Sequence, residues 1–304
     1  MYRGVAAAAE YVPALEPLTR HPVYRYLHRL LLVFGVLGLP ALLRALGMRS
    51  WRDVGLGRPW AHRRAVARGA LLGAATVIAM AAVPLAVGAR AFKDGVTAGQ
   101  LAAAALAALV AAAVVAPLEE LLFRGVVDGG LRRWRAPGAG APAVALALSS
   151  GFYALVHFFT RPAPPAHVAW HSGFALLAGM LAGFADLETL VPQFLTLCAV
   201  GAVLAALARR TGALWASVGV HAGAVFVLQL YGRLVAAPPP AGTGAAAADA
   251  AGRWLWGSGR LVDGWVALGT VGAAALAGAA ALRRRDRRRA AGPALAVVRG
   301  GGCA

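Results

Sequence analysis

Four ionisable residues that can take part in acid–base chemistry lie in otherwise apolar segments. Glu119 and Glu120 are adjacent in VVAPLEELLFRG, His157 lies in GFYALVHFF, and His221 lies in SVGVHAGAVF. A carboxylate and two imidazoles around one polar pocket can activate a water molecule and stabilise the oxyanion that forms when water attacks an amide. These residue types therefore favour amide hydrolysis.

The two glutamates have different expected roles. Glu120 and Arg124 are four residues apart on one helix face, so their charges can pair and lower the cost of burial. Glu119 is rotated by about 100° and has no such local partner, which makes it the better candidate for a general base. The sequence has no HExxH motif, which disfavours a zincin. The apolar segments contain no recognisable Ser, His and Asp triad, which disfavours a serine protease.

A structural reading of the histidines must be weighed against the catalytic one. A single histidine in a membrane helix more often makes an interhelical hydrogen bond than it catalyses a reaction. Here three separate apolar segments carry ionisable groups, and such groups are costly to insert into a membrane. Their recurrence favours one shared site.

Composition indicates a membrane protein. The 304 residues are 60% hydrophobic and 14% charged, and their mean hydropathy is +0.67. A net charge of +18 would suggest nucleic acid if the arginines lay along one surface, but they alternate with long apolar stretches. We therefore expect membrane lipid as a partner and no nucleic acid. Two cysteines without a CxxC pair cannot form a disulfide framework.

The elements that must position these residues are membrane helices, each of which needs about 20 mainly apolar residues. The sequence predicts an all-α fold, a polytopic transmembrane bundle of about seven to eight helices. Seven runs are predicted, at 26–43, 66–89, 98–118, 141–159, 190–208, 211–231 and 263–282. An alternative topology has an eighth crossing, between residues 160 and 190. Seven crossings place the arginine-rich residues 44–68 and 283–289 in the cytoplasm.

The chemical residues also follow a known pattern. Glu119, Glu120 and Arg124 form an EExxxR motif, and Tyr153 precedes His157 by four positions. In this order, the motifs resemble those of the CPBP family of intramembrane proteases, which includes type II CAAX prenyl endopeptidases and bacteriocin-processing and self-immunity proteins. The resemblance covers residues 98–231.

The third motif of that family is incomplete here. His221 matches its histidine, but Val225 stands where an asparagine or aspartate follows four positions later. The resemblance implies that Glu119 and His157 activate water and that His221 supports the oxyanion. Loss of one oxyanion donor costs about 3 kcal/mol of transition-state stabilisation. Either activity is weak or another group replaces this donor. Ser217, one turn before His221, and Gln229, two turns after it, lie near the same helix face, and we favour Gln229.

The resemblance divides the chain into residues 1–97 with the N-terminal tail and first two membrane helices, 98–231 with the catalytic core, and 232–304. The last part holds an external loop, the final membrane helix and a basic cytoplasmic tail. We expect an integral protein of a bacterial inner (plasma) membrane. No bound organic cofactor is expected. Zinc held by Glu119, His157 and His221, with a fourth position open for water, and a metal-free glutamate mechanism both stay open.

The predicted function is an intramembrane endopeptidase of the CAAX prenyl protease type. Its substrate would be a peptide or a lipid-modified protein at the membrane, and prenylation is not assumed. The alternative is a catalytically weak or inactive immunity or scaffold protein, which Val225 favours. A small transporter is disfavoured because the sequence shows no repeat and no paired broken helices.

Overall fold

Helices make up almost all of the ordered chain. The protein is seen in a computed structural model, which describes residues 23–134, 141–160, 171–236 and 261–299. It also describes the isolated residues 4, 8, 11, 12, 16, 162, 163, 169, 252 and 254–257. Five described helices are long and apolar enough to cross a membrane. These findings confirm the all-α membrane fold class, whereas the number of seven or eight crossings stays a prediction.

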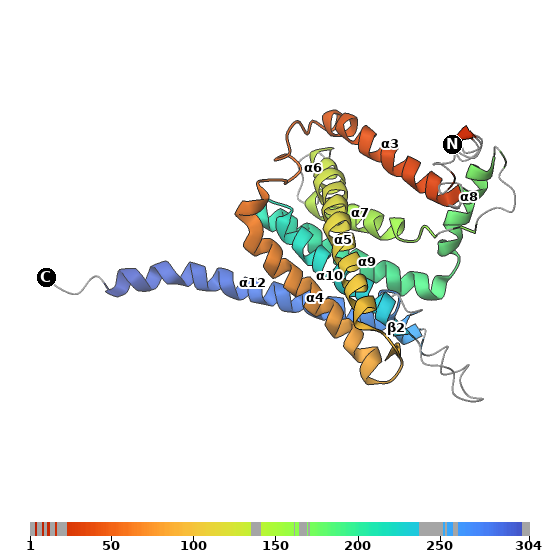
Figure 1. Ribbon diagram of the computed structural model, residues 1–304. Coiled ribbons are helices and arrows are strands. Elements are labelled where there is room, and N and C mark those ends of the chain that lie inside the picture. The colour runs from red at the N-terminus through yellow and green to blue at the C-terminus, as the bar shows by residue number, and fades with distance from the viewer. Residues whose placement is uncertain are drawn as a thin grey trace.

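The helices follow the predicted apolar runs in order (Figure 1). The longer ones are α3 (Val23–Ala45), α4 (Arg63–Ala86), α5 (Ala98–Glu120), α7 (Ala141–Val156), α9 (Leu187–Thr211), α10 (Trp215–Leu234) and α12 (Trp265–Arg299). The shorter ones are η2 (Pro59–His62), η3 (Leu121–Asp128), α6 (Gly129–Trp134), α8 (Ser172–Met180) and η4 (Leu181–Phe184). Among its described residues, the ambiguous segment after His157 holds the short helices α8 and η4 before α9 begins.

The third helix is longer than the predicted run of 98–118. Elements α5, η3 and α6 form one helical rod of 37 residues, which begins with a capping box between Thr97 and Gln100. The middle element, η3, is a π-helix, in which the backbone N–H bonds five residues back instead of four. The charges that ended the predicted run do not end the helix, because Glu120 and Asp128 are both paired inside the bundle.

Two glycine pairs let α4 and α10 pack backbone against backbone. Gly69 and Gly73 of α4 face α10, and Gly219 and Gly223 of α10 face α4. A Cβ atom at Gly69 would lie 2.7 Å from the carbonyl oxygen of Ala216, and one at the other three positions would overlap a backbone carbonyl of the facing helix. Small residues at this spacing allow close approach of membrane helices. Gly219 and Gly223 flank His221, so this contact fixes its depth and direction.

We expect Gly223→Leu to push α10 away from α4 and lower stability by about 1–3 kcal/mol, the usual cost of overpacking. Cleavage activity should fall with it, because His221 moves with α10. Thermal unfolding in detergent measures the first effect. Gly232→Leu is the matched control, since Gly232 lies on the same helix with no atom near its Cβ position. Equal melting temperatures for both variants would contradict the close packing.

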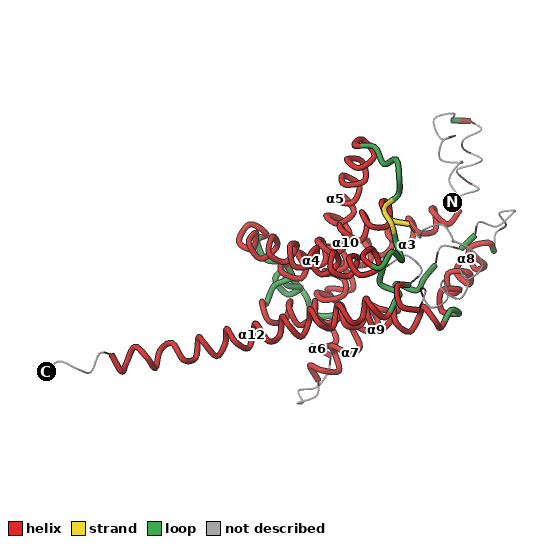
Figure 2. The backbone as a smooth tube through the Cα atoms, turned by 90° about the horizontal axis from the view of Figure 1, so that it is seen from below, coloured by secondary structure: helices red, strands yellow, loops and turns green. Residues whose placement is uncertain are grey.

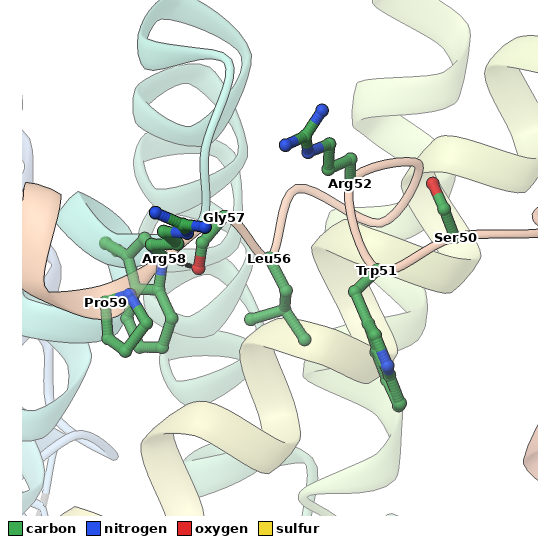
Figure 3. A pocket seen from close by; sticks show the side chains of 8 residues that line it. Ser50, Trp51, Arg52, Leu56, Gly57, Arg58 and Pro59 are labelled. Atoms are coloured by element: carbon green, nitrogen blue, oxygen red, sulfur yellow. Dashed lines mark hydrogen bonds between the residues drawn. The ribbon is translucent and has the colours of Figure 1, made fainter.

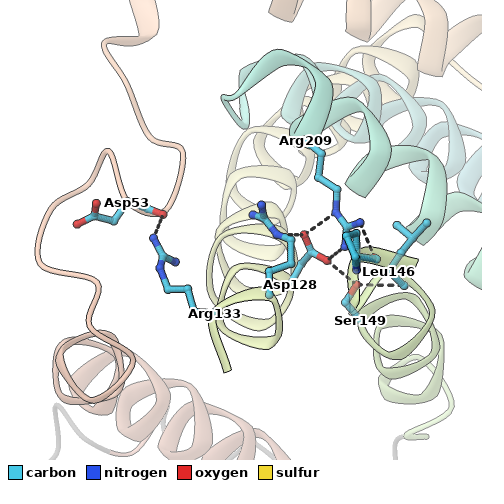
Figure 4. A network of polar contacts seen from close by, with 8 residues as sticks. Asp53, Asp128, Arg133, Leu146, Ser149 and Arg209 are labelled. Atoms are coloured by element: carbon cyan, nitrogen blue, oxygen red, sulfur yellow. Dashed lines mark hydrogen bonds and ion pairs between the residues drawn. The ribbon is translucent and has the colours of Figure 1, made fainter. Parts of the chain in front are cut away.

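A buried aspartate joins the ends of three helices at the end of the bundle that the topology prediction assigns to the cytoplasm. Asp128, at the end of η3, pairs with Arg209 of α9 and lies 3.2 Å from Arg132 Nε (Figure 4). The Ser149 hydroxyl of α7 donates to it at 3.3 Å, and Arg209 also donates to the Pro142 carbonyl at 2.7 Å. The cluster therefore fastens η3, α7 and α9 together.

The opposite end carries a feature that the all-helical prediction lacked. Strands β1 (Ala91–Phe92) and β2 (Val235–Ala236) form a short antiparallel pair, which ties the end of α10 to the loop between α4 and α5 (Figure 2). The predicted external loop follows β2, and its residues 237–250 lie outside the described part. Helix α12 packs on α4 and α9 through its first half, and its second half extends away from the other helices.

Candidate active site

The structure brings the predicted site residues together from three helices. Glu119 and Glu120 are the last two residues of α5, directly before the π-helical segment. His157 directly follows α7, and His221 lies within α10 between the two glycines that contact α4. A π-helical turn beside ionisable residues is a common feature of functional sites in helical proteins.

Glu119 occupies the centre of the cluster. Its Oε2 atom lies 3.9 Å from Nε2 of His157 and 3.6 Å from Nε2 of His221. This oxygen is buried and makes no hydrogen bond within the described part of the chain, although the side chain as a whole is 28% exposed. Glu119 and His157, which is 30% exposed, are therefore the members of the cluster that solvent or substrate can reach.

Glu120 is fully buried and holds two partners. Its Oε1 atom lies 2.9 Å from Nδ1 of His221 and 3.2 Å from Nη1 of Arg124, whose side chain is 2% exposed. The Arg124 guanidinium carbon also lies 4.4 Å from the centre of the Tyr153 ring, a cation–π contact. Glu120 and Arg124 thus have the expected local pairing, and Glu120 additionally orients His221.

The hydrogen bonds decide which nitrogen of each histidine carries a proton. Nδ1 of His157 lies 2.7 Å from the Tyr153 carbonyl oxygen, which can only accept, so Nδ1–H donates. Nδ1 of His221 likewise donates to the Glu120 carboxylate. In the neutral form, each ring presents an Nε2 lone pair to Glu119, and His221 can donate from Nε2 only as an imidazolium.

Aromatic rings form one wall of the site. Tyr153 is buried, and its ring lies 4.6 Å from that of His157 and 6.2 Å from that of His221. Phe123 packs edge-on against Tyr153 at 5.0 Å and shares a hydrophobic cluster with Leu197 of α9. The tyrosine of the second motif therefore separates the two imidazoles from the core between α7 and α9.

A surface pocket of about 730 Å³ lies away from this cluster (Figure 3). It is lined by Ser50, Trp51, Arg52, Leu56, Gly57, Arg58, Pro59 and Trp215. The Trp215 indole donates to the Gly57 carbonyl at 3.0 Å and so closes one side of the pocket. None of the lining residues can act as a general base, so this pocket is not a candidate for the reaction. In the adjoining loop, hydrogen bonds from Ser50 and Arg49 hold the pKa of Asp53 below its ordinary value.

Zinc was left open beside a metal-free mechanism, and the donor distances can be compared with those of a zinc site. Tetrahedral zinc with bonds of about 2.1 Å places neighbouring donor atoms about 3.4 Å apart. Both measured separations from Glu119 Oε2, 3.6 and 3.9 Å, are longer. No three His, Cys, Asp or Glu side chains of the described residues form a metal-binding group. As they lie, these donor atoms are somewhat more widely spaced than ideal tetrahedral zinc ligands, and the reaction proposed below uses protein groups alone.

The structure contradicts the prediction that Gln229 replaces the missing polar residue. Gln229 is exposed, and its side-chain oxygen accepts a hydrogen bond from Arg233 at 2.8 Å. Eight residues of α-helix turn Gln229 by about 80° from His221, so the two side chains do not share a face. Ser217, one turn before His221, donates instead to the Leu214 carbonyl.

Comparison with known families gives one match. The model of the type II CAAX prenyl endopeptidase Rce1-like family matches residues 101–227. This part of the chain is similar to that family. No curated protein and no solved structure matches the chain. The Rce1-like region contains every residue of the cluster, and at the family level it supports an intramembrane peptidase of the CAAX type.

The sequence analysis did not identify two buried polar residues, Asp128 and Gln193. Asp128 follows Arg124 by four positions, as Arg124 follows Glu120, so a third charge at this spacing was visible in the sequence. Its main partner, Arg209, is 81 residues away in the chain, and nothing in the sequence pairs them. A second buried polar residue, Gln193, lies on α9.

Proposed function

We propose that the protein is an intramembrane endopeptidase that cleaves a peptide or lipid-modified protein tail at the membrane. The proposal rests mainly on one observation. Nε2 of His157 and Nε2 of His221 both lie within 4 Å of Oε2 of Glu119, although the three residues come from three different helical segments. The membrane-spanning helices around them and the Rce1-like match support a substrate that is itself associated with the membrane.

Glu119 acts as the general base in the proposed reaction. Two acceptors 3.9 Å apart, its Oε2 and Nε2 of His157, can both lie about 2.8 Å from a single water oxygen. Glu119 takes one proton from that water while the oxygen attacks the peptide carbonyl carbon. His157 accepts the second O–H of the water as a hydrogen bond and orients it, because its Nδ1–H is held by Tyr153.

His221 stabilises the negative charge that forms on the carbonyl oxygen. As an imidazolium, it donates from Nε2 to the oxyanion while Nδ1–H stays on Glu120. This state also balances the cluster, since Glu119 and Glu120 together carry one more negative charge than Arg124 can neutralise. The tetrahedral intermediate then collapses, the C–N bond breaks, and the leaving amine takes the proton from Glu119.

The alternative is a membrane immunity or scaffold protein without cleavage, and one comparison separates the two. Membranes from bacterial cells that express the protein or its Glu119→Gln variant are digested and their new peptide termini compared by mass spectrometry. The proposal expects at least one terminus that requires Glu119. Identical termini, together with an equal phenotype and equal expression, would favour the binding role.

Metal dependence is a separate prediction. Because the proposed reaction uses protein groups alone, we expect cleavage by the purified protein to change less than about twofold after treatment with a strong zinc chelator and dialysis. Metal content is measured in the same samples by plasma mass spectrometry. Stoichiometric zinc that disappears in a His157→Ala, His221→Ala variant, with activity restored by added zinc, would overturn the metal-free mechanism.

A further inference from the structure

The pocket of about 730 Å³ between the α3–α4 loop and the start of α10 contains charge that the proposed reaction does not use (Figure 3). Arg52 and Arg58 both line this pocket, and none of its lining residues is acidic. Both arginines are exposed, and neither guanidinium group forms an ion pair or a hydrogen bond with a residue that the structure describes. The volume lies within the range of small-molecule sites. The pocket therefore presents two positive charges that lack a counterion in the described part of the chain.

The acidic residue of the same loop is held by other groups. Oδ2 of Asp53 accepts hydrogen bonds from the backbone N–H of Arg49 at 3.0 Å and from the backbone N–H of Ser50 at 2.7 Å. The Ser50 hydroxyl donates to the same oxygen at 2.9 Å. The Asp53 carboxylate thus closes a turn of the loop and does not pair with Arg52 or Arg58. An anion in the pocket would meet both guanidinium groups without competition from this carboxylate.

The pocket lies where two membrane helices begin. Arg58 directly precedes η2, the start of the span that continues into α4, and Trp215 is the first residue of α10. Both spans are long and apolar enough to cross a membrane. Arg133 of α6 donates to the Asp53 carbonyl at 3.3 Å, so the loop lies at the same end of the bundle as the Asp128 cluster. This position corresponds to the headgroup level of the predicted cytoplasmic leaflet.

The two sides of the loop differ in polarity. The guanidinium groups of Arg52 and Arg58 point to one side, whereas Trp51 and Leu56 point to the other (Figure 3). Leu56 packs against the buried cluster at the junction of α9 and α10, and Trp51 is 62% exposed. Exposed tryptophans at the ends of membrane helices are typical of the boundary between headgroups and hydrocarbon. A ligand that matches both sides has an anionic part and an apolar part.

We propose that this pocket binds an anionic phospholipid, with its phosphate between Arg52 and Arg58 and its glycerol and acyl chains along Trp51 and Leu56. Guanidinium groups bind phosphate oxygens through charge-assisted hydrogen bonds. Basic pockets on the cytoplasmic side of membrane helices are typical sites for acidic lipid headgroups. A free phosphate ion matches the arginines but has no part that contacts Trp51 or Leu56. This inference does not depend on the peptidase function.

The bound lipid would hold the loop against the helical rod that carries the active site. Val54 is 2% exposed, and a Cβ atom on Gly125 of η3 would lie 3.0 Å from the Val54 carbonyl oxygen. Gly125 directly follows Arg124, which pairs with Glu120. Because a ligand of the folded state raises its stability by mass action, the lipid should stabilise the protein as it fills the pocket.

The test uses the full-length protein in a mild detergent, and native mass spectrometry measures the lipid that it retains. Dioleoyl phosphatidylglycerol is the anionic probe, and dioleoyl phosphatidylcholine has the same acyl chains without the net charge. The pocket variant, Arg52→Gln with Arg58→Gln, should weaken phosphatidylglycerol retention by at least about tenfold, since each basic residue at a membrane surface contributes a factor of about five. The control variant, Arg63→Gln with Arg64→Gln, removes the same charge at exposed positions outside the pocket and should change retention by less than about twofold.

A second pair of variants tests the apolar side. Trp51→Ala should weaken retention by about threefold to tenfold, because the ring no longer covers the apolar part of the lipid. Trp60→Ala, at a tryptophan that is 79% exposed and does not line the pocket, should leave retention unchanged. Thermal unfolding gives an independent readout. Phosphatidylglycerol should raise the melting temperature of the wild type and of the control variant more than that of the pocket variant.

Four results would overturn the proposal. Equal losses in the pocket and control variants would show a general effect of charge, and equal retention of phosphatidylcholine would show that the headgroup charge is not recognised. Displacement of the lipid by millimolar inorganic phosphate would indicate a site for a free anion. Unchanged phosphatidylglycerol retention in the pocket variant, together with a raised KM for the cleaved peptide, would assign the pocket to the substrate instead.

Discussion

Glu119→Gln is expected to lower kcat by about 10²–10⁴-fold, the range that a positioned general base contributes. The substitution keeps the shape of the side chain but removes its ability to take a proton from water. Its Oε2 atom has no hydrogen bond in the described chain, so the substitution breaks no hydrogen bond of that atom. Initial rates with an internally quenched peptide that carries a cleavage site found by the terminus comparison, at enzyme concentrations corrected for folded protein, measure the effect.

The control for this variant is Glu188→Gln, which removes the same charge at an exposed position near the start of α9. It should retain the wild-type rate within twofold. A Glu119→Gln protein that unfolds at the wild-type temperature and cleaves at the wild-type rate would leave the site without its base, and the hydrolytic mechanism would have to be abandoned.

Glu120→Ala is expected to destabilise the protein by about 3–5 kcal/mol, the largest effect on stability that the structure indicates. The substitution leaves the Arg124 guanidinium buried without its carboxylate and takes from His221 the partner of its Nδ1–H. The free energy of unfolding is measured by chemical denaturation of the protein in detergent. Glu188→Ala, at an exposed site, should change it by less than about 0.5 kcal/mol.

A double variant shows that the loss comes from the unpaired charge. Replacing both partners, Glu120→Leu with Arg124→Met, should recover most of the stability, because an apolar pair of similar volume often equals a buried ion pair. Activity should stay low, since His221 would no longer be held by a carboxylate. If the double variant is as unstable as Glu120→Ala alone, the pairing of these two charges does not explain the effect.

Much of the site could be predicted because membrane insertion makes polar residues conspicuous. Glu119, Glu120, His157 and His221 stand out from apolar runs, and the spacing of Glu120 and Arg124 already predicts their contact. The apolar runs likewise predict the helices in their order, since each must satisfy its backbone within the segment.

The rest depends on information that hydropathy does not contain. The predicted run stopped at residue 118 because charged residues follow it, and hydropathy does not show that these charges are paired or that the helix continues in π-helical form. Gln229 was chosen by its distance along the chain, although its rotation about the helix directs it to Arg233. In a chain with 38 glycines, the two pairs that join α4 and α10 do not stand out.

The π-helical segment separates two functions along one rod. It begins directly after the carboxylate that orients His221 and ends on the aspartate bound by Arg209. If the same eight residues adopted ordinary α-helical bonding, Asp128 would turn relative to Glu120, because an α-helix makes more turns over the same number of residues. Either Glu120 or Asp128 would then leave its partners. The π-helical segment thus keeps Glu120 and Asp128, at the two ends of one helix, each oriented toward its own partners.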